Sequence, residues 1–250
     1  MAKVNILGVG VDDIDTPGLE RAVLNSIQKG TKEIFAYANI HTINAARHSD
    51  KFRDWLNGGP VVYCDGDGVR FGAKLLGQRL PPKTVLTRWV WELGALFQKN
   101  QVSVFLLGGS KDTVSLAADR WIERFPQLKV VGFHHGYFSR NGRENEDVIS
   151  MINDHSPGVL FVGFGTPEQE LWIRDHFKRL KVNSIIPCGG MIEYLAGARQ
   201  SPPEWMVHYR MEWMHRLFQD PLRMWKRYVI GNPAFMFQIV MAKMRKGKVV

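Results

Sequence analysis

The stretch Pro60-Val61-Val62-Tyr63-Cys64-Asp65-Gly66-Asp67-Gly68-Val69 joins an apolar run to a turn of acids and glycines. The run predicts a buried strand, and helix-compatible sequence follows from Val69 to Leu76. Because ligands of open α/β sheets bind at the carboxyl ends of strands, Asp65 is expected at a ligand-binding edge. The glycines would let a ligand approach the backbone closely. A plain strand-to-helix turn explains the same residues, since Asp and Gly are common in turns.

The same order of strand, turn and helix recurs outward from this stretch. Strands are predicted at residues 3–9, 33–38, 60–63, 102–107, 129–133, 158–163 and 182–187. Helices are predicted at 18–28, after Asn44 to about 56, and at 69–76, 89–99, 113–125, 142–152 and 168–180. This alternation predicts an α/β fold with a Rossmann-like, mostly parallel sheet. The strands are continuous apolar runs, which indicates helices on both faces.

The pattern changes after Ser201-Pro202-Pro203, where the sequence becomes helical only. We therefore expect a Rossmann-like core at 1–200 and a helical, basic C-terminal appendage at 201–250. Of the net charge of +9, +7 lies in the last 43 residues. The basic residues there are Arg210, Arg216, Arg223, Lys226, Arg227, Lys243, Arg245, Lys246 and Lys248. Either a helical hairpin with a solvated basic face or an element that meets anionic lipid fits this amphipathic segment.

Composition bounds the class of protein. With 250 residues, 45% apolar and 23% charged, the sequence is typical of a soluble globular protein. No apolar run approaches the roughly 20 residues that a spanning helix needs, and the N-terminus lacks the form of a signal peptide. Cys64 and Cys188 fall at predicted strand ends and are expected to be reduced thiols in a cytoplasmic protein.

Three further stretches could bind a ligand or simply shape the backbone. Gly108-Gly109-Ser110 lies between a strand and a helix, where backbone N–H groups suit a phosphate or merely form a turn. Thr42 and Asn44 begin a helix, so they could cap it or hold a sugar or nucleotide. Thr166-Pro167-Glu168-Gln169 fits a capping box, with Thr166 capping the helix and Gln169 reaching back.

Metal-binding patterns are weak. Asp65-Gly66-Asp67 matches an Asp-x-Asp that could hold a divalent ion on a diphosphate, but Asp13-Ile14-Asp15 matches equally well. His134 and His135 would point apart on a strand. We expect no metal site and no cofactor.

Taken together, the motifs resemble one family in order along nearly the whole chain. The sequence is similar to the WecG/TagA/CpsF family, glycosyltransferase family 26. The similar stretches are Asn39–Asn44, Asp65–Val69, Lys74–Gly77, Leu106–Gly109, Gly136–Phe138, Gly163–Trp172, Cys188–Gly190, Glu212–Leu217, Pro221 and Arg223–Tyr228.

This resemblance implies an inverting, metal-independent hexosyl- or N-acetylhexosaminyltransferase of glycopolymer biosynthesis. The donor would be a UDP-sugar and the acceptor a polyprenyl-diphosphate-linked sugar at the cytoplasmic membrane face. Asp65 would be the general base. Pocket and diphosphate contacts would come from Thr42, Asn44, Gln169, Arg216, Arg223, and Lys226 or Arg227.

The sequence departs from the family at two places. A Gly-x-Asp after Leu80-Pro81 is replaced by Arg88 or Trp89, and a Gly-Gly-x-Phe/Tyr-Asp ends instead in Glu193. An extra cation could suit an acidic donor sugar. The sequence leaves open the identity of the sugars and whether the chain forms a homo-oligomer.

Three rival functions remain. A metal-dependent transferase would use Asp65 and Asp67, and transfer that survives EDTA would exclude it. A basic nucleic-acid-binding protein would use the C-terminal segment, but no recognised nucleic-acid motif is present, so no nucleic-acid partner is expected. A dinucleotide-dependent oxidoreductase is disfavoured because no Gly-x-Gly-x-x-Gly follows the first strand.

Overall fold

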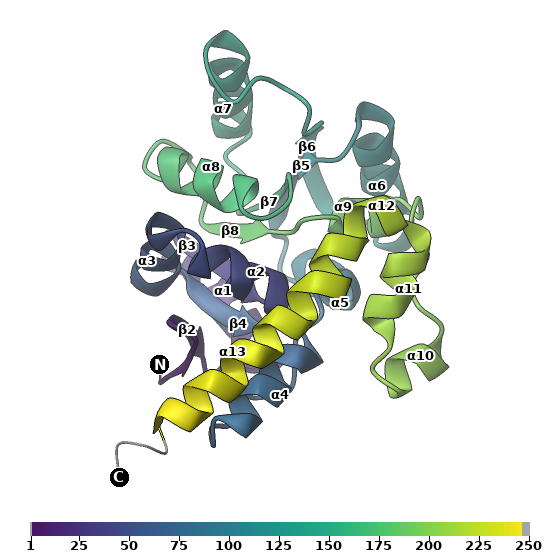
Figure 1. Cartoon of the computed structure of the whole chain (residues 1–250). Helices are drawn as coiled ribbons and strands as arrows, with labels where there is room; N and C mark the ends of the chain where they lie inside the picture. The colour runs from purple at the N-terminus through teal and green to yellow at the C-terminus, as the bar shows by residue number, and fades with distance from the viewer. Residues whose placement is uncertain (1, 247–250) are drawn as a thin grey trace.

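A computed structural model describes residues 2–246 and contains two sheets. The main sheet has six strands, all parallel, in the order β4-β3-β8-β7-β5-β6 (Figure 1). Its strands are β3 (Glu33–Ala38), β4 (Val61–Cys64), β5 (Ser103–Gly108), β6 (Lys129–His134), β7 (Val159–Gly163) and β8 (Ser184–Pro187). The predicted parallel α/β fold is therefore confirmed.

Strand order reverses in the middle of this sheet. The chain passes from β3 outward to β4 and then crosses to β5 on the other side of the sheet. It continues outward to β6 and returns through β7 to β8, which pairs with β3. Ligands of doubly wound sheets bind in the crevice at such a reversal, outside the carboxyl ends of the strands. This topology places the ends of β3, β4, β7 and β8 around one crevice.

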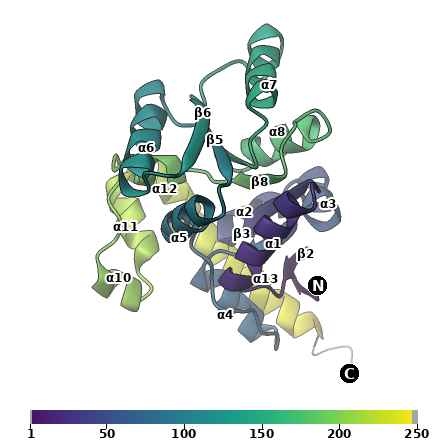
Figure 2. The ribbon, with the colours of Figure 1, turned by 180° about the vertical axis from the view of Figure 1, so that it is seen from behind.

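Helices cover both faces of the main sheet, as the continuous apolar strands predict. The described core helices are α1 (Thr16–Gln28), α2 (Ile40–Arg47), α3 (Asp50–Gly58), α4 (Asp67–Leu75), α5 (Leu86–Lys99), α6 (Lys111–Arg124), α7 (Arg143–His155), α8 (Glu168–His176) and α9 (Met191–Leu195). One face packs against α1, α5 and α6, which lie in front in Figure 2. The other face packs against α2, α3 and α4 at one end and α7 and α8 at the other.

The N-terminal strand prediction is wrong in one respect. Residues 3–9 do not form one strand of the main sheet but belong to a hairpin of β1 (Lys3–Ile6) and β2 (Val9–Asp12), which pair antiparallel. Leu7 and Gly8 form its turn with φ of 52° and 93°, and a two-residue hairpin turn needs such positive values. The hairpin is fixed to the main sheet where Val62 N donates to Asp12 Oδ2 at 2.8 Å.

One further local prediction is wrong and another is confirmed. β6 ends at His134, so His135 lies outside the strand, and the two imidazole rings lie with centroids 4.3 Å apart, tilted by 30°, instead of pointing apart. Both cysteines are buried free thiols at strand ends, as predicted.

The C-terminal part is helical, as predicted. Its elements are α10 (Glu204–His208), α11 (Glu212–Gln219), α12 (Pro221–Trp225), the π-helical turn η1 (Lys226–Ile230) and α13 (Gly231–Lys246). Figure 1 shows α13 crossing the core diagonally over α2 and α4, with α10 and α11 to one side. Lys248 lies outside the described residues. No helix within residues 2–246 is long and apolar enough to cross a bilayer.

Helix α13 is part of the core packing. Phe235 and Ile239 are fully buried in the cluster that α2, α3 and α4 form on the sheet. Gly72 on α4 permits this approach, because a Cβ there would lie 2.9 Å from the Phe235 ring. The division into a core at 1–200 and an appendage at 201–250 stays a prediction, and any separation of the two must break this contact.

Candidate functional site

Three adjoining cavities form a groove along the carboxyl edge of the main sheet. The central cavity has a volume of about 210 Å³. The apolar cavity, of about 440 Å³, and the third cavity, of about 140 Å³, each share lining residues with it. The central cavity is lined by residues that include Tyr37, Asn39, Asp65, Thr166, Gly189 and Glu193; the apolar cavity by Ile40, Val69, Phe71, Val85, Trp213 and Met236; and the third cavity by Gly109, Gly136, Tyr137, Arg140 and Glu168.

Asp65 directly follows β4 and lies on the wall that the central and apolar cavities share. Its backbone N–H donates to Ala38 O at 2.9 Å, which extends the β3–β4 ladder and fixes the residue at the sheet edge. Burial raises the pKa of the Asp65 carboxyl, while Arg216, the Asn39 hydrogen bond and Arg227 oppose that rise. A carboxylate more basic than an exposed aspartate is suited to accept a proton.

Asn39 connects Asp65 to a buried hydroxyl. It caps α2, and its Oδ1 accepts from Thr42 N at 3.0 Å and from Thr42 Oγ1 at 3.2 Å. Its Nδ2 donates to Asp65 Oδ2 at 3.4 Å. Thr42 is fully buried and is absent from the walls of the three cavities, so it acts on the site through Asn39.

Gln169 lies behind the central cavity and connects strand β3 with the loops after β7 and β8. Its Oε1 accepts from Gly165 N at 3.2 Å and from Gly189 N at 2.9 Å, and its Nε2 donates to the Tyr37 hydroxyl at 2.9 Å. The capping-box prediction is wrong, because Pro167 precedes α8 and this helix has no side-chain cap. The Thr166 hydroxyl instead donates to Glu170 Oε1 at 3.0 Å.

Glu170 is a buried acid beneath the site that the sequence reading missed. Its Oε1 accepts from Thr166 and, at 2.8 Å, from Gln169 Nε2, while its Oε2 has no hydrogen-bond partner among the described residues. Burial raises the pKa of Glu170 to about 7. The charge of Glu170 in turn raises the pKa of Tyr37 and Cys188, which adds to the larger effect of their own burial.

Arginines of the C-terminal helices reach the groove. Arg216 from α11 and Arg227 from η1 line both the central and the apolar cavity, and Arg223 from α12 lines the central and third cavities. Arg223 Nη1 lies 4.0 Å from Glu193 Oε1. Lys226 is exposed, with Nζ 5.8 Å from the Trp225 ring centroid, and lines none of the three cavities.

Arg216 is held between aromatic side chains. Its guanidinium lies 5.8 Å from the ring centroid of Tyr194. Burial acts to lower the pKa of Arg216, but Tyr228, Tyr194 and Asp65 outweigh it, so the pKa is raised and the side chain stays cationic.

The remaining predicted residues are Gly108, Gly109 and Asn44. Gly108 has φ of 153°, and a Cβ there would lie 2.6 Å from Gly163 O, so the turn after β5 needs glycine. Gly109 lines the third cavity. Asn44 lies away from the groove, where its Nδ2 donates to Gly231 O at 2.9 Å and anchors the start of α13.

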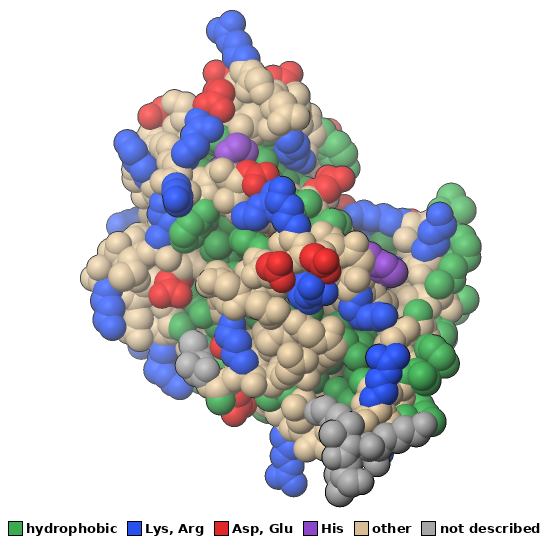
Figure 3. Space-filling model, turned by 60° about the vertical axis from the view of Figure 1, so that its left-hand side comes forward, with side chains coloured by type: hydrophobic (Ala, Val, Ile, Leu, Met, Phe, Trp, Pro, Cys, Tyr) green, Lys and Arg blue, Asp and Glu red, His purple; other side chains and the backbone are tan. Residues whose placement is uncertain are grey.

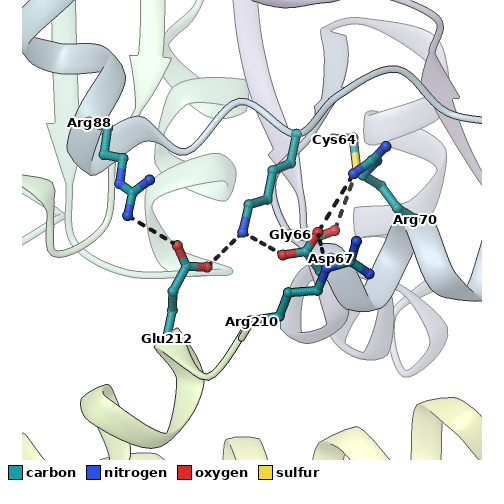
Figure 4. A network of polar contacts seen from close by, with 8 residues as sticks. Cys64, Gly66, Asp67, Arg70, Arg88, Arg210 and Glu212 are labelled. Atoms are coloured by element: carbon teal, nitrogen blue, oxygen red, sulfur yellow. Dashed lines mark hydrogen bonds and ion pairs between the residues drawn. The ribbon is translucent and has the colours of Figure 1, made fainter. Parts of the chain in front are cut away.

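A charged network ties α11 to the core (Figure 4). Lys83 bridges Asp67 on α4 and Glu212 on α11, the latter at 2.8 Å. Arg88, at a position where the sequence departs from the family, lies 3.6 Å from Glu212. Asp67 also lies 3.6 Å from Arg70. Both Asp67 oxygens therefore face cations.

The other departures have separate surroundings. Trp89 is buried in the core, and its Nε1 donates to Glu20 Oε1 at 3.3 Å. Glu193 pairs with Arg199, which also pairs with Asp220 at 3.1 Å.

Several residues of the site were not predicted from the sequence. Tyr37, Asn39 and His41 line the central cavity from the end of β3 and the start of α2. The polar segment Asn39–Asn44 after a strand was the signal for Asn39 and His41, but it also fits simple capping of a helix. The Lys83–Glu212 pair joins residues 129 positions apart and has no local signal.

Known proteins match the chain over nearly its full length. An N-acetylglucosaminyldiphosphoundecaprenol N-acetyl-beta-D-mannosaminyltransferase of Staphylococcus aureus (strain MW2) is 31% identical over 97% of this chain and 94% of that protein. The similarly named protein of strain MRSA252 is 30% identical over the same shares. A sequence model of the family described as "Glycosyl transferase WecG/TagA/CpsF family" matches residues 4–249. Through this match and the shared relatives, the chain that builds this groove belongs to the WecG/TagA/CpsF family of glycosyltransferases.

Proposed function

We propose that this glycosyltransferase moves a sugar from a UDP-sugar to a polyprenyl-diphosphate-linked sugar, with inversion, in the synthesis of a cell-surface glycopolymer. The observation that carries the proposal is the position of Asp65. Its carboxylate lies on the wall between two cavities, and Arg216 and Arg227 line both of them. The relatives' name, which pairs a diphosphoundecaprenol-linked sugar with a transferred N-acetylmannosamine, supports this substrate class.

The chemistry follows from that position. The oxygen of the acceptor hydroxyl attacks the anomeric carbon of the donor from the face opposite the nucleotide, and Asp65 takes the proton of that hydroxyl. The bond between that carbon and the phosphate oxygen breaks, and its electron pair leaves with UDP. Guanidinium groups stabilise the added negative charge by bidentate hydrogen bonds. Among the cationic side chains that line the groove, Arg216, Arg223 and Arg227 of the C-terminal helices are the groups that would do so.

We assign the donor to the central and third cavities. Their walls contain backbone turns after β5, β7 and β8, including Gly109, Gly165 and Gly189, where a phosphate could approach closely. Arg223 lies at the junction of the two cavities. In this arrangement the sugar end of the donor meets Asp65, and the acceptor arrives from the other side of that carboxylate.

The C-terminal helices supply a surface suited to a membrane. Large apolar side chains are exposed there, and in Figure 3 hydrophobic side chains form a band down the right-hand edge, with Lys and Arg beside it. Such a surface places apolar groups in the headgroup zone and cations on anionic lipid. The exposed apolar residues include Trp205, Tyr209, Phe218, Leu222, Val229, Ile230, Phe237 and Val240.

We propose that this surface docks on the inner face of the cell membrane. Sedimentation with vesicles of anionic lipid tests this docking. The variant Leu222→Glu with Ile230→Glu should bind less, and unchanged binding would contradict it. Truncation near residue 200 is a poorer test, because it removes the buried Phe235.

The assay that tests the transferase proposal offers a panel of UDP-sugars with a lipid-diphosphate-linked acceptor. We expect transfer from one of them by the wild type and severe loss in Asp65→Ala. Absence of transfer from every UDP-sugar would contradict the donor class, and a fully active variant would contradict the role of Asp65.

A further inference from the structure

The apolar cavity lies outside the two cavities assigned to the donor. Its volume of about 440 Å³ is larger than that of the central cavity, which it adjoins. Asp65, Arg216 and Arg227 line the wall that it shares with the central cavity. Besides polar residues that include Asp67, Arg210 and Glu212, the remaining wall contains apolar side chains from α2, α4, α11, α13 and the segment before α5. These are Ile40, Val69, Phe71, Val85, Trp213 and Met236.

We infer that this cavity holds the first isoprene units of the acceptor's polyprenyl chain, an inference that rests on the proposed function. A polyprenyl diphosphate has an ionic head followed directly by a branched hydrocarbon. Arg216 and Arg227 line both cavities, so they can contact the acceptor's diphosphate as well as the leaving UDP. With the acceptor hydroxyl at Asp65, the hydrocarbon then meets the apolar side chains of this cavity. The lining therefore combines cations suited to an ionic head with apolar side chains suited to a hydrocarbon.

Two aromatic residues mark the hydrocarbon part. Phe71 on α4 is 50% exposed and Trp213 on α11 is 41% exposed, and both line the cavity. Large apolar surface left in water on a folded protein is typical of a binding site. Trp213 belongs to α11, which also carries Phe218, one of the exposed apolar side chains proposed to meet lipid.

Besides Asp65, two acids, Asp67 and Glu212, line the cavity, and both are compatible with a hydrocarbon as its occupant. Lys83 bridges them, and Arg70 and Arg88 lie close to one or the other. Their charge is therefore largely balanced. A neutral hydrocarbon chain is the occupant that needs no further partner there.

The test compares two acceptors that carry the same sugar diphosphate, assayed in detergent. One carries a chain of several isoprene units and the other a methyl group. For Phe71→Ala and Trp213→Ala we expect the KM for the prenyl acceptor to rise about tenfold, since an apolar wall is lost. The KM for the methyl acceptor should not change, which also reports that each variant is folded. Phe133→Ala, a half-exposed phenylalanine on β6 that lines none of the cavities, should alter neither value.

Two results would overturn the inference while leaving the proposed function intact. One is an equal change, or none, in the KM for both acceptors in the Phe71 and Trp213 variants. The other is the same selective rise in Leu222→Ala, whose 89% exposed side chain lies outside the cavity, because the effect would then come from general contact with lipid. If the wild type transfers to neither acceptor, the proposed function itself fails.

Discussion

The side-chain amide of Asn39 donates a hydrogen bond to the carboxylate of Asp65, with 3.4 Å between Nδ2 and Oδ2. Asn39 is itself fixed by the backbone N–H and the hydroxyl of Thr42. A buried threonine thus sets the orientation of the proposed base through one intermediate side chain. Arg216 on α11 is the charge that lowers the pKa of the same carboxylate most.

Thr42 should affect turnover more than substrate binding. Replacing Thr42 with Val keeps its shape but removes the hydroxyl, one of the two donors to Asn39 Oδ1, so Asn39 is held less firmly against Asp65. We expect kcat to fall roughly three- to tenfold, since one neutral hydrogen bond contributes about 1 kcal/mol, with little change in KM. Thr42→Ser keeps the hydroxyl and should retain activity. Steady-state kinetics measure both, and equal kcat in wild type and Thr42→Val would contradict this positioning role.

Arg216 should set the acidic limb of the pH–rate profile. Asp65 acts as a base only when ionised, so kcat/KM falls as pH drops through its pKa, which burial raises above the ordinary value of about 3.9. Arg216 opposes that rise. Its loss in Arg216→Gln should therefore move the limb to higher pH. Arg216→Lys keeps the cation and should leave the limb near its wild-type position. A limb that stays in place in Arg216→Gln would show that Asp65 is not the titrating group.

Glu170 should make the free energy of unfolding depend on pH. Its folded pKa is about 7, whereas an unfolded glutamate has a pKa of about 4.3. Between these values the folded chain keeps a proton that the unfolded chain releases, so stability falls as pH rises toward 7. Glu170→Gln mimics the protonated side chain. Between pH 5 and pH 8, its free energy of unfolding should therefore decrease by about 2 kcal/mol less than that of the wild type. Urea unfolding measures this difference.

The control for that measurement is Glu204→Gln. Glu204 is exposed on α10, so this variant should follow the wild-type pH dependence. If Glu170→Gln and Glu204→Gln behave alike, the buried carboxyl of Glu170 has an ordinary pKa and the account of it is wrong.

Lys83 should hold α11 against the core. In Lys83→Met, Asp67 and Glu212 lose the cation between them, so the local stability of α11 should fall by roughly 1–3 kcal/mol. Hydrogen exchange should speed up in residues 212–219 and stay unchanged in α6. Lys111→Met removes an exposed lysine and is the matched control. If hydrogen exchange in α11 is as slow in Lys83→Met as in the wild type, Lys83 does not act as a bridge.

Local sequence was enough to predict the sheet and the place of Asp65. The strands after Glu33, Pro60 and Val102 are apolar throughout, and only a sheet covered on both faces explains that pattern. Asp65 ends one of them, so its position at the sheet edge follows from the strand alone. The β1–β2 hairpin was missed because its two halves read as one apolar run interrupted by Gly8.

The surroundings of Asp65 could not be predicted in the same way. Gln169 and Thr166 fit a capping box by spacing, but their hydrogen bonds go to the loops after β7 and β8 and to Glu170. Burial of Glu170 and bridging by Lys83 depend on contacts between distant segments. Spacing along the chain carries no information about such contacts.

The most direct test of the central claim is the rate of sugar transfer to a lipid-diphosphate-linked acceptor by Asp65→Asn, compared with wild type at saturating UDP-sugar. Asn keeps the shape and the contact with Asn39 but cannot take a proton. We predict a fall in kcat of about 10²- to 10⁴-fold, the usual contribution of a general base, with the donor KM within a few-fold of wild type. Transfer at the wild-type rate would contradict the assignment of Asp65 as the base.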